Sequence, residues 1–164
     1  MSDLAALIAD LKSTDLSKRI QAAEELSSRG EEVSQAVVAL AQACGDDVEE
    51  VREAATAALE ESGPPGLDDL PALIELFCTP QSDVAYWAIT LVGRLGAEAA
   101  DAVEPLAEVV RQHSVPAVRE RAAWALGCIG PVAAPSLDVL QLAATSDNPR
   151  LARLARAAIE QIMV

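Results

Sequence analysis

Apolar residues recur along the chain at the spacing of an α-helix. Within residues 48–62, Val51, Ala55, Ala58 and Leu59 share one face when successive positions are placed 100° apart. Strict alternation of apolar and polar residues is rare, so β-strands are not expected. The pattern predicts ten helices, over residues 3–12, 16–29, 33–44, 48–62, 67–78, 82–95, 99–112, 116–129, 134–145 and 149–162.

The helical pattern itself repeats, with a period of about 33 residues. Glycines stand at positions 30, 63, 96 and 130, and an alanine lies eight residues before each of them. Each period holds two helices, and each pair leaves an apolar face that only a neighbouring pair can cover. The repeat therefore predicts a solenoid. Other columns keep the same period, among them Leu7, Leu40, Leu73, Leu106 and Leu140.

The predicted repeats form one domain, residues 1–164, with a half-repeat at each end. The half-repeats are 1–12 and 147–164, and the full repeats are 13–46, 47–79, 80–113 and 114–146. In the second repeat Gly63 is expected to end the first helix in a left-handed conformation. Gly93, Gly96, Gly127 and Gly130 are also expected to close helices. In the second repeat we expect Pro64, Pro65 and Gly66 to form the turn after Gly63.

A short motif accompanies each repeat, with an arginine, alanines, a leucine and a glycine at fixed spacing. It is clearest as Val51-Arg52, Ala55, Ala58-Leu59 and Gly63, and again as Val118-Arg119, Ala122, Ala125-Leu126 and Gly130. The first repeat has Glu25 in the second alanine position, and the third has Ala85 in place of the arginine. The motif resembles that of short bacterial HEAT repeats, also called phycobilin-lyase-type HEAT-like repeats.

This resemblance implies an all-α, right-handed α-solenoid of about five helical hairpins, with the second helices lining the concave face. Repeats of this kind usually serve as protein-binding scaffolds, and some belong to chromophore lyases. The motif arginine of the family commonly pairs with an acidic residue of a neighbouring repeat. For this chain the resemblance implies ion pairs from Arg19, Arg52 and Arg119, with Asp15, Asp46, Asp47 and Asp83 as candidate partners.

The chain is strongly acidic, with 12 Lys and Arg against 26 Asp and Glu and a formal net charge of −14. This balance argues against nucleic acid and anionic membrane surfaces as partners, because both attract cationic side chains. The acidity is uneven, since residues 1–83 hold 18 acidic and 5 basic residues and residues 84–164 hold 8 and 7. One hypothesis is therefore that copies of the chain attract head to tail. A separate hypothesis is self-association through the C-terminal face, because no second helix follows residues 149–162 to cover their apolar side chains.

Six carboxylates are predicted at outward positions of the second helices. A concave surface of one sign attracts a partner of opposite charge, so they predict a groove for a basic protein segment. The alternative is that these carboxylates only keep an alanine-rich helical stack in solution. The candidate residues are Asp68, Glu75, Asp101, Glu104, Glu108 and Asp138.

Aromatic residues make up only 2% of the chain, and Tyr86, Trp87 and Trp124 all fall in the third and fourth repeats. Trp87 is expected to pack between repeats. Trp124 either stacks against Ile89 or Arg156 of a neighbouring repeat or stands exposed as an aromatic anchor for a partner.

The residues offer no catalytic, cofactor-binding or metal-binding constellation. The single histidine, His113, cannot form a His-based metal site, and Cys44, Cys78 and Cys128 match no metal or disulfide spacing. We therefore expect a protein that is not an enzyme and uses no cofactor. The first residues lack a secretory signal and no long apolar run suggests a transmembrane helix, so a cytoplasmic location with reduced thiols is expected.

Two functions remain open from the sequence. The first is a non-catalytic scaffold or adaptor that binds a basic protein segment through its acidic concave face. The alternative is an accessory or subunit protein of a bilin or tetrapyrrole lyase-type system. A third interpretation, an idealised or engineered repeat protein, is opposed by the irregular third repeat and the varied loops.

Overall fold

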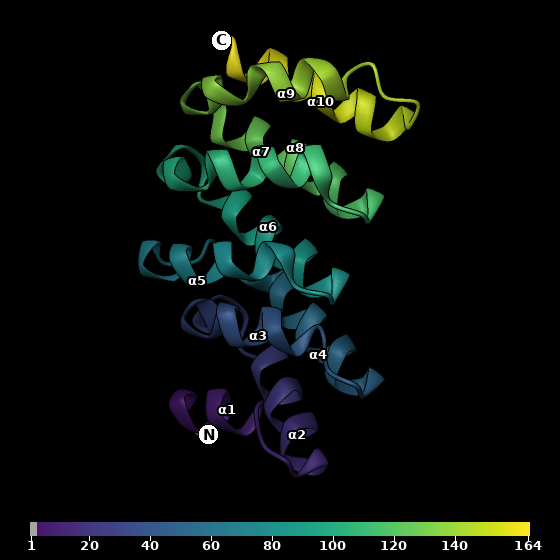
Figure 1. Cartoon of the computed structure of the whole chain (residues 1–164). Coiled ribbons are helices and arrows are strands. Elements are labelled where there is room, and N and C mark those ends of the chain that lie inside the picture. The colour runs from purple at the N-terminus through teal and green to yellow at the C-terminus, as the bar shows by residue number, and fades with distance from the viewer. Residues whose placement is uncertain (1–2) are drawn as a thin grey trace.

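The structure is a computed structural model that describes residues 3–164, the side chains of residues 31 and 32 excepted. All regular elements in this range are helical, and they stack along one direction with the N- and C-terminal ends at opposite ends of the stack (Figure 1). The all-α solenoid is confirmed. The α-helices are α1 (Leu4–Asp10), α2 (Leu16–Ser27), α3 (Val37–Ala43), α4 (Glu49–Glu61), α5 (Leu70–Glu75), α6 (Ser82–Arg94), α7 (Val103–Gln112), α8 (Pro116–Ile129), α9 (Leu137–Ala143) and α10 (Pro149–Ile162). The 3-10 helices are η1 (Gly30–Ala36), η2 (Leu67–Asp69), η3 (Leu76–Cys78), η4 (Gly96–Ala102) and η5 (Gly130–Ser136).

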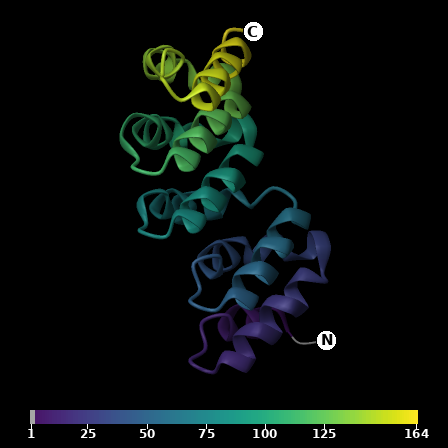
Figure 2. The same cartoon turned by 90° about the vertical axis from the view of Figure 1, so that its right-hand side faces the viewer.

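The helices form two columns, which Figure 2 shows side by side. The first helices of the hairpins, α2, α4, α6, α8 and α10, make one column. The second helices, α1, α3, α5, α7 and α9, make the other, and all of them except α1 are preceded by a 3-10 helix. We call the outer surfaces of these columns the first-helix face and the second-helix face.

The first helices agree closely with the sequence prediction, whereas α3, α5, α7 and α9 begin three or four residues later than predicted. For example, α8 spans the predicted residues 116–129, but α7 begins at Val103 rather than at residue 99. The reason is a 3-10 segment that precedes each of the later second helices, such as η4 before α7. Apolar periodicity does not distinguish this tighter turn from the first turn of an α-helix.

The glycines that recur with the repeat behave in two ways. Gly30, Gly96 and Gly130 have φ angles of 57°, 57° and 73°, a region in which a side chain would be strained. Gly63 does not share this conformation, so its predicted left-handed cap is wrong. The chain from Ser62 to Gly66 has no turn and begins extended, with ψ of Ser62 at 144°. Two successive prolines fix φ and favour extended neighbours, which explains this linker.

The core consists of the predicted columns, and it is aliphatic. The leucine column of the second helices is between 0% and 4% exposed, and so is the alanine column Ala22, Ala55, Ala88, Ala122 and Ala155 of the first helices. Small side chains in the alanine column let neighbouring helices approach closely. Phe77 is the largest side chain in this core.

The stack is not uniform, because α4 and α6 barely touch. Neighbouring first helices pack closely in the pairs α2–α4, α6–α8 and α8–α10, but across the middle of the molecule it is α3 that packs on α6. Gly45 permits this approach, since an added Cβ would lie 2.7 Å from Cγ2 of Val84. In Figure 2 the part from α1 to α4 is offset sideways from the part that follows. The extended linker from Ser62 to Gly66 spans this offset.

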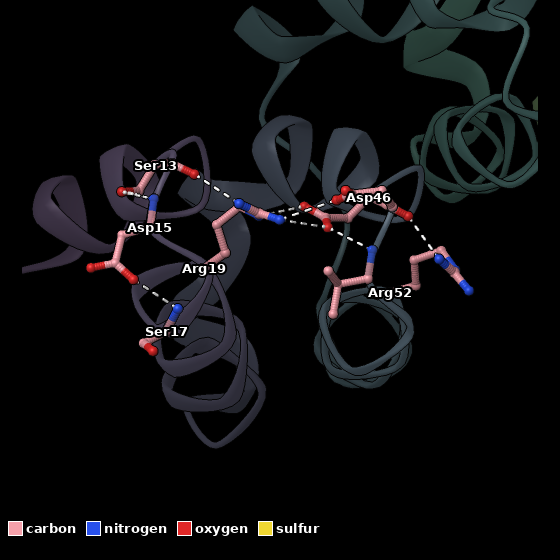
Figure 3. Close-up of polar contacts among 8 residues, drawn as sticks. Ser13, Asp15, Ser17, Arg19, Asp46 and Arg52 are labelled. Atoms are coloured by element: carbon pink, nitrogen blue, oxygen red, sulfur yellow. Dashed lines mark hydrogen bonds and ion pairs between the residues drawn. The ribbon is translucent and has the colours of Figure 1, made fainter.

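The motif arginines bind mainly backbone carbonyls, as Figure 3 shows for the first two. Arg19 donates to the carbonyl of Ser13 at 3.1 Å. It also binds Asp46 at the end of its own repeat at 2.9 Å and Asp47 at the start of the next repeat at 3.1 Å. Arg52 donates to the carbonyl of Asp46 at 2.8 Å, and Arg119 to that of Val110 at 2.8 Å. The implied ion pair is thus found for Arg19, whereas within the described residues Arg52 and Arg119 have no carboxylate partner.

Two glycines allow the first helix of the following hairpin to pack closely. An added Cβ at Gly93 would lie 2.5 Å from Cζ3 of Trp124, and one at Gly127 would lie 3.0 Å from Cα of Ala158. Both glycines lie within helices, α6 and α8, so the prediction that they close helices is wrong. They are contact points between neighbouring repeats.

One segment, Pro116–Ala143, is long and apolar enough to cross a membrane by length and composition. It comprises three elements, α8, η5 and α9, with a break at Gly130 where φ is positive. Helix α8 packs against α6, α7 and α10, which accounts for its apolar surface.

Candidate protein-binding site

The six predicted carboxylates lie on elements of the second-helix column. Glu104 and Glu108 belong to α7, Glu75 ends α5, and Asp138 lies in the first turn of α9. Asp68 and Asp101 lie in η2 and η4, one turn before the α-helices that follow. All are exposed except Glu108, which is half-buried. Their predicted outward position is therefore observed.

Three open hollows separate successive elements of the second-helix column, and each is lined by one of these carboxylates. Asp101 lines a hollow of about 380 Å³ against α5. Glu108 lines one of about 430 Å³ between the end of α7 and the segment Cys78–Pro80. Asp138 lines one of about 580 Å³ between α7 and α9, together with Asp147 and two arginines, Arg111 and Arg119. The surface is thus a row of shallow hollows with a carboxylate at each.

The charge of this row is only partly neutralised from within the chain. Arg111 pairs with Glu108 one helical turn away, and both side chains are more than two-fifths exposed. Exposed pairs of this kind are weak and exchange readily with other partners. Exposed apolar side chains lie in the same hollows, since Leu67 is 51% and Leu142 71% exposed. Acidic and apolar groups together suit a segment with basic and aliphatic side chains.

Trp124, the candidate aromatic anchor, is half-buried on the first-helix face. Its ring lies against Gly93 of the preceding first helix, a neighbour other than the predicted Ile89 or Arg156. The guanidinium carbon of Arg121 lies 4.7 Å from the centre of the same ring. Arg121 was not among the residues predicted from the sequence, although it stands three residues before Trp124 and therefore on the same side of the helix.

The thiols and the histidine differ in their surroundings. Burial raises the pKa of the Cys44 thiol to about 12, although a hydrogen bond with Thr56 partly opposes this. The side chain of Cys78 is exposed and that of Cys128 is half-buried, and none of the three cysteines forms a disulfide. The Nδ1 atom of His113 accepts a hydrogen bond from the backbone N–H of Val115 at 3.1 Å. Throughout residues 3–164 as described, no three His, Cys, Asp or Glu side chains gather closely enough to hold a metal ion.

Known structures with the same architecture include both designed and natural proteins. A designed armadillo repeat protein in complex with peptide (KR)4 superimposes with a TM-score of 0.66 at 17% identity, covering 97% of this chain and 81% of that one. Computationally designed armadillo repeat proteins for modular peptide recognition give 0.65 at 21% identity, covering 98% and 82%. The complex of CpcE and CpcF of phycocyanin lyase from Nostoc sp. PCC7120 gives 0.65 at 28% identity, covering 99% of this chain and 65% of that one.

No curated protein matches the sequence. The family model for HEAT repeats matches residues 4–85 and 70–160, which together span nearly the whole chain. The paired helices, the recurring alanine and leucine columns and the stacked architecture agree with this match. The chain belongs to the HEAT-repeat family.

Proposed function

We propose that the protein is a non-catalytic scaffold or adaptor that binds a basic protein segment along its second-helix face. The observation that carries the proposal is the row of hollows between successive second-helix elements, each lined by a carboxylate, Asp101, Glu108 or Asp138. A segment in extended conformation is long enough to cross several hollows, because each of its residues spans about 3.3 Å.

The carboxylates of the second-helix face favour association with a cationic partner. Clustered carboxylates of one sign raise the local concentration of a cationic partner and speed its encounter. The overall charge of −14 acts in the same direction at low salt. Specific binding differs from this general attraction because it depends on which carboxylates are present and not only on how many.

The test uses the peptide (KR)4, which one structurally similar designed protein binds, as the probe. We expect a salt-dependent Kd for the wild-type chain in isothermal titration calorimetry. The variant Glu104→Lys/Glu108→Lys/Asp138→Lys should weaken binding at least about tenfold. The matched control Glu49→Lys/Glu50→Lys/Glu53→Lys changes the net charge equally but lies on α4 of the first-helix column, where these residues are exposed.

The comparison of the two variants decides the proposal. Binding that survives in the control and is lost in the second-helix variant supports a site on the second-helix face. Equal losses in both variants would mean that only net charge matters, and would refute the site. Circular dichroism of both variants shows whether each retains the helical fold.

A second function is an accessory or subunit role in a bilin or tetrapyrrole lyase-type system. It is favoured by the 28% identity to the phycocyanin lyase complex, which extends over 99% of this chain. It predicts an absorbance shift when a bilin is mixed with the protein. An unchanged bilin spectrum at saturating protein would exclude this role.

A further inference from the structure

The first-helix face carries a cationic and aromatic cluster that the acidic composition does not suggest. It consists of Tyr86 on α6 with Arg121 and Trp124 on α8. The guanidinium carbon of Arg121 lies 4.4 Å from the ring centre of Tyr86 and 4.7 Å from that of Trp124. Arg121 also donates to the hydroxyl of Tyr86. Two aromatic faces thus hold the guanidinium in place by cation–π attraction.

Arg121 differs from most other arginines of the chain, because its guanidinium is half-buried and its one hydrogen-bond partner among the described residues is the hydroxyl of Tyr86. Arg19, Arg111 and Arg150 bind carboxylates, and Arg29 pairs with Glu25. Other arginines donate to carbonyl oxygens, namely Arg52, Arg94, Arg119 and Arg156. In the part of the chain that the structure describes, Arg121 has neither a carboxylate nor a carbonyl partner. A half-buried charge with no counter-charge is costly, which leaves this group suited to an external anion.

The acidic side chain next to Arg121 in the sequence is already occupied. Glu120 is buried at 8% exposure, and one of its carboxylate oxygens accepts from Asn148 at 2.8 Å. Its other oxygen pairs with Arg150 at 3.1 Å. Burial lowers the pKa of the Arg121 guanidinium, and the nearby Arg150 charge lowers it further. Both effects indicate a guanidinium whose positive charge is not balanced by the protein.

Two hollows meet at this cluster, and both are lined by Tyr86, Ala117 and Arg121. The smaller, of about 220 Å³, is lined by three arginines, Arg121, Arg150 and Arg153, against the single occupied carboxylate of Glu120. The larger, of about 630 Å³, lies where α4 and α6 fail to pack and includes Trp87. Glu60 and Asp83 line the larger hollow, so an anionic group is favoured in the smaller one.

We propose that this first-helix surface binds an acidic segment of a protein partner, with a carboxylate side chain seated in the smaller hollow on Arg121 and Arg153. The planar guanidinium offers paired N–H donors that match a carboxylate, and the flanking rings offer contact to the rest of the segment. A short acidic segment fits better than a nucleic acid, because the strong negative charge of the whole chain repels a long polyanion. The proposed surface is separate from the second-helix face.

The protein supplies its own reporter for this binding. Its two tryptophans are Trp87 and Trp124, and each lines one of the two hollows. A titration with the peptide (Glu-Ser)4, which contains no aromatic residue, can therefore be followed by intrinsic fluorescence. The matched peptide (Gln-Ser)4 removes the charge and keeps the length. We expect a saturable change with the acidic peptide and at least about tenfold weaker binding of the neutral one.

Three single substitutions test the assignment. Arg121→Gln should raise the Kd for (Glu-Ser)4 at least about tenfold, and the exposed Arg153→Gln about threefold. The control Arg111→Gln removes the same charge from the second-helix face and should change the Kd less than about twofold. If Arg121→Gln fails to fold, the exposed Arg153→Gln carries the test. Binding of (KR)4 should be unaffected by Arg121→Gln, so the two proposed surfaces fail or succeed independently.

Four outcomes would overturn the proposal. The first is that (Glu-Ser)4 and (Gln-Ser)4 bind with equal Kd. The second is that Arg111→Gln raises the Kd for (Glu-Ser)4 as much as Arg121→Gln and Arg153→Gln do. The third is that an oligothymidylate binds more tightly than (Glu-Ser)4. The fourth is a dimer in sedimentation that Arg121→Gln converts to a monomer, which would make the occupant a second copy of this chain.

Discussion

Arg94 is predicted to hold together the two parts of the stack where α4 and α6 do not pack. It is the last residue of α6, and its Nη1 atom donates to the carbonyl oxygens of Leu59 at 2.8 Å and Ser62 at 2.9 Å. These carbonyls lie at the end of α4, where no further turn of helix supplies a donor. We expect the substitution Arg94→Met to destabilise this junction while keeping most of the apolar stem.

The expected loss is about 1.5 kcal/mol in the free energy of unfolding. Hydrogen bonds from a charged donor contribute about 1.5–3 kcal/mol each when both partners are removed from water. Arg94 is only half-buried, so water replaces part of this interaction in the variant. Burial also lowers the pKa of the Arg94 guanidinium, which shows that its charge is held there at some cost. Removing that charge relieves this cost and so offsets part of the lost hydrogen-bond energy, which places the expected loss at the lower end of the range of about 1.5–3 kcal/mol.

Urea unfolding followed by circular dichroism measures this difference. The control Arg111→Met removes an arginine whose exposed pair with Glu108 should be worth less than about 0.5 kcal/mol. Because stability in a solenoid is a sum over neighbouring contacts, a weakened junction should also lower the urea m-value as the two parts begin to unfold separately. A loss for Arg94→Met no larger than that for Arg111→Met would refute this account of the junction.

Three further predictions concern packing, pH and thiol reactivity. Gly93→Ala should lower the free energy of unfolding by about 1 kcal/mol, as measured by thermal unfolding. The added Cβ would lie 2.5 Å from the Trp124 ring, and such overpacking costs about 1–3 kcal/mol, whereas the higher helix propensity of alanine offsets about 1 kcal/mol. Burial alone would raise the pKa of Asp46, but hydrogen bonds from neighbouring N–H groups lower it overall. The stability that its carboxylate contributes is therefore present above the unfolded pKa of 3.8 and is lost as the pH falls through the lower folded pKa. In urea titrations Asp46→Asn should be less stable than wild type at pH 7, and the two proteins should be equally stable well below pH 3.8. Ellman's reagent at pH 8 should label the exposed Cys78 first and leave Cys44, with its pKa of about 12, unlabelled until unfolding.

The sequence predicted the first helices well and the start of the second helices poorly, for a physical reason. Burial of one helix face leaves a period in the sequence, and α8 and α10 were therefore located to the residue. The 3-10 turns before α7 and α9 depend on how the backbone crosses from one column to the other, which leaves no such period. The break between α4 and α6 did leave a signal in the two prolines at 64 and 65, which favour extended backbone on both sides.

The outward position of the acidic residues was predictable, but the partners of the arginines were not. A column such as Asp68 and Asp101 follows from helical register alone, and both residues are exposed. The choice between a carboxylate and a carbonyl for Arg52 depends on distances of a few ångströms at the end of the preceding helix. Arg52 binds the carbonyl of Asp46, the same residue whose carboxylate binds Arg19 of the preceding repeat. Sequence spacing alone does not separate these two roles.

The local charge at Arg121 shows why net charge is a weak guide to the partners of a solenoid. A net charge of −14 governs attraction at distances beyond about 8 Å only when salt is low, because counter-ions screen it at physiological ionic strength. At contact distance each hollow presents its own groups, and the hollow at Arg121 presents three arginines and one carboxylate that is already paired. Composition therefore argues against long polyanions as partners, whereas a short acidic segment is governed by the few groups that it touches. An open stack of helices has two such faces, and they need not carry the same charge.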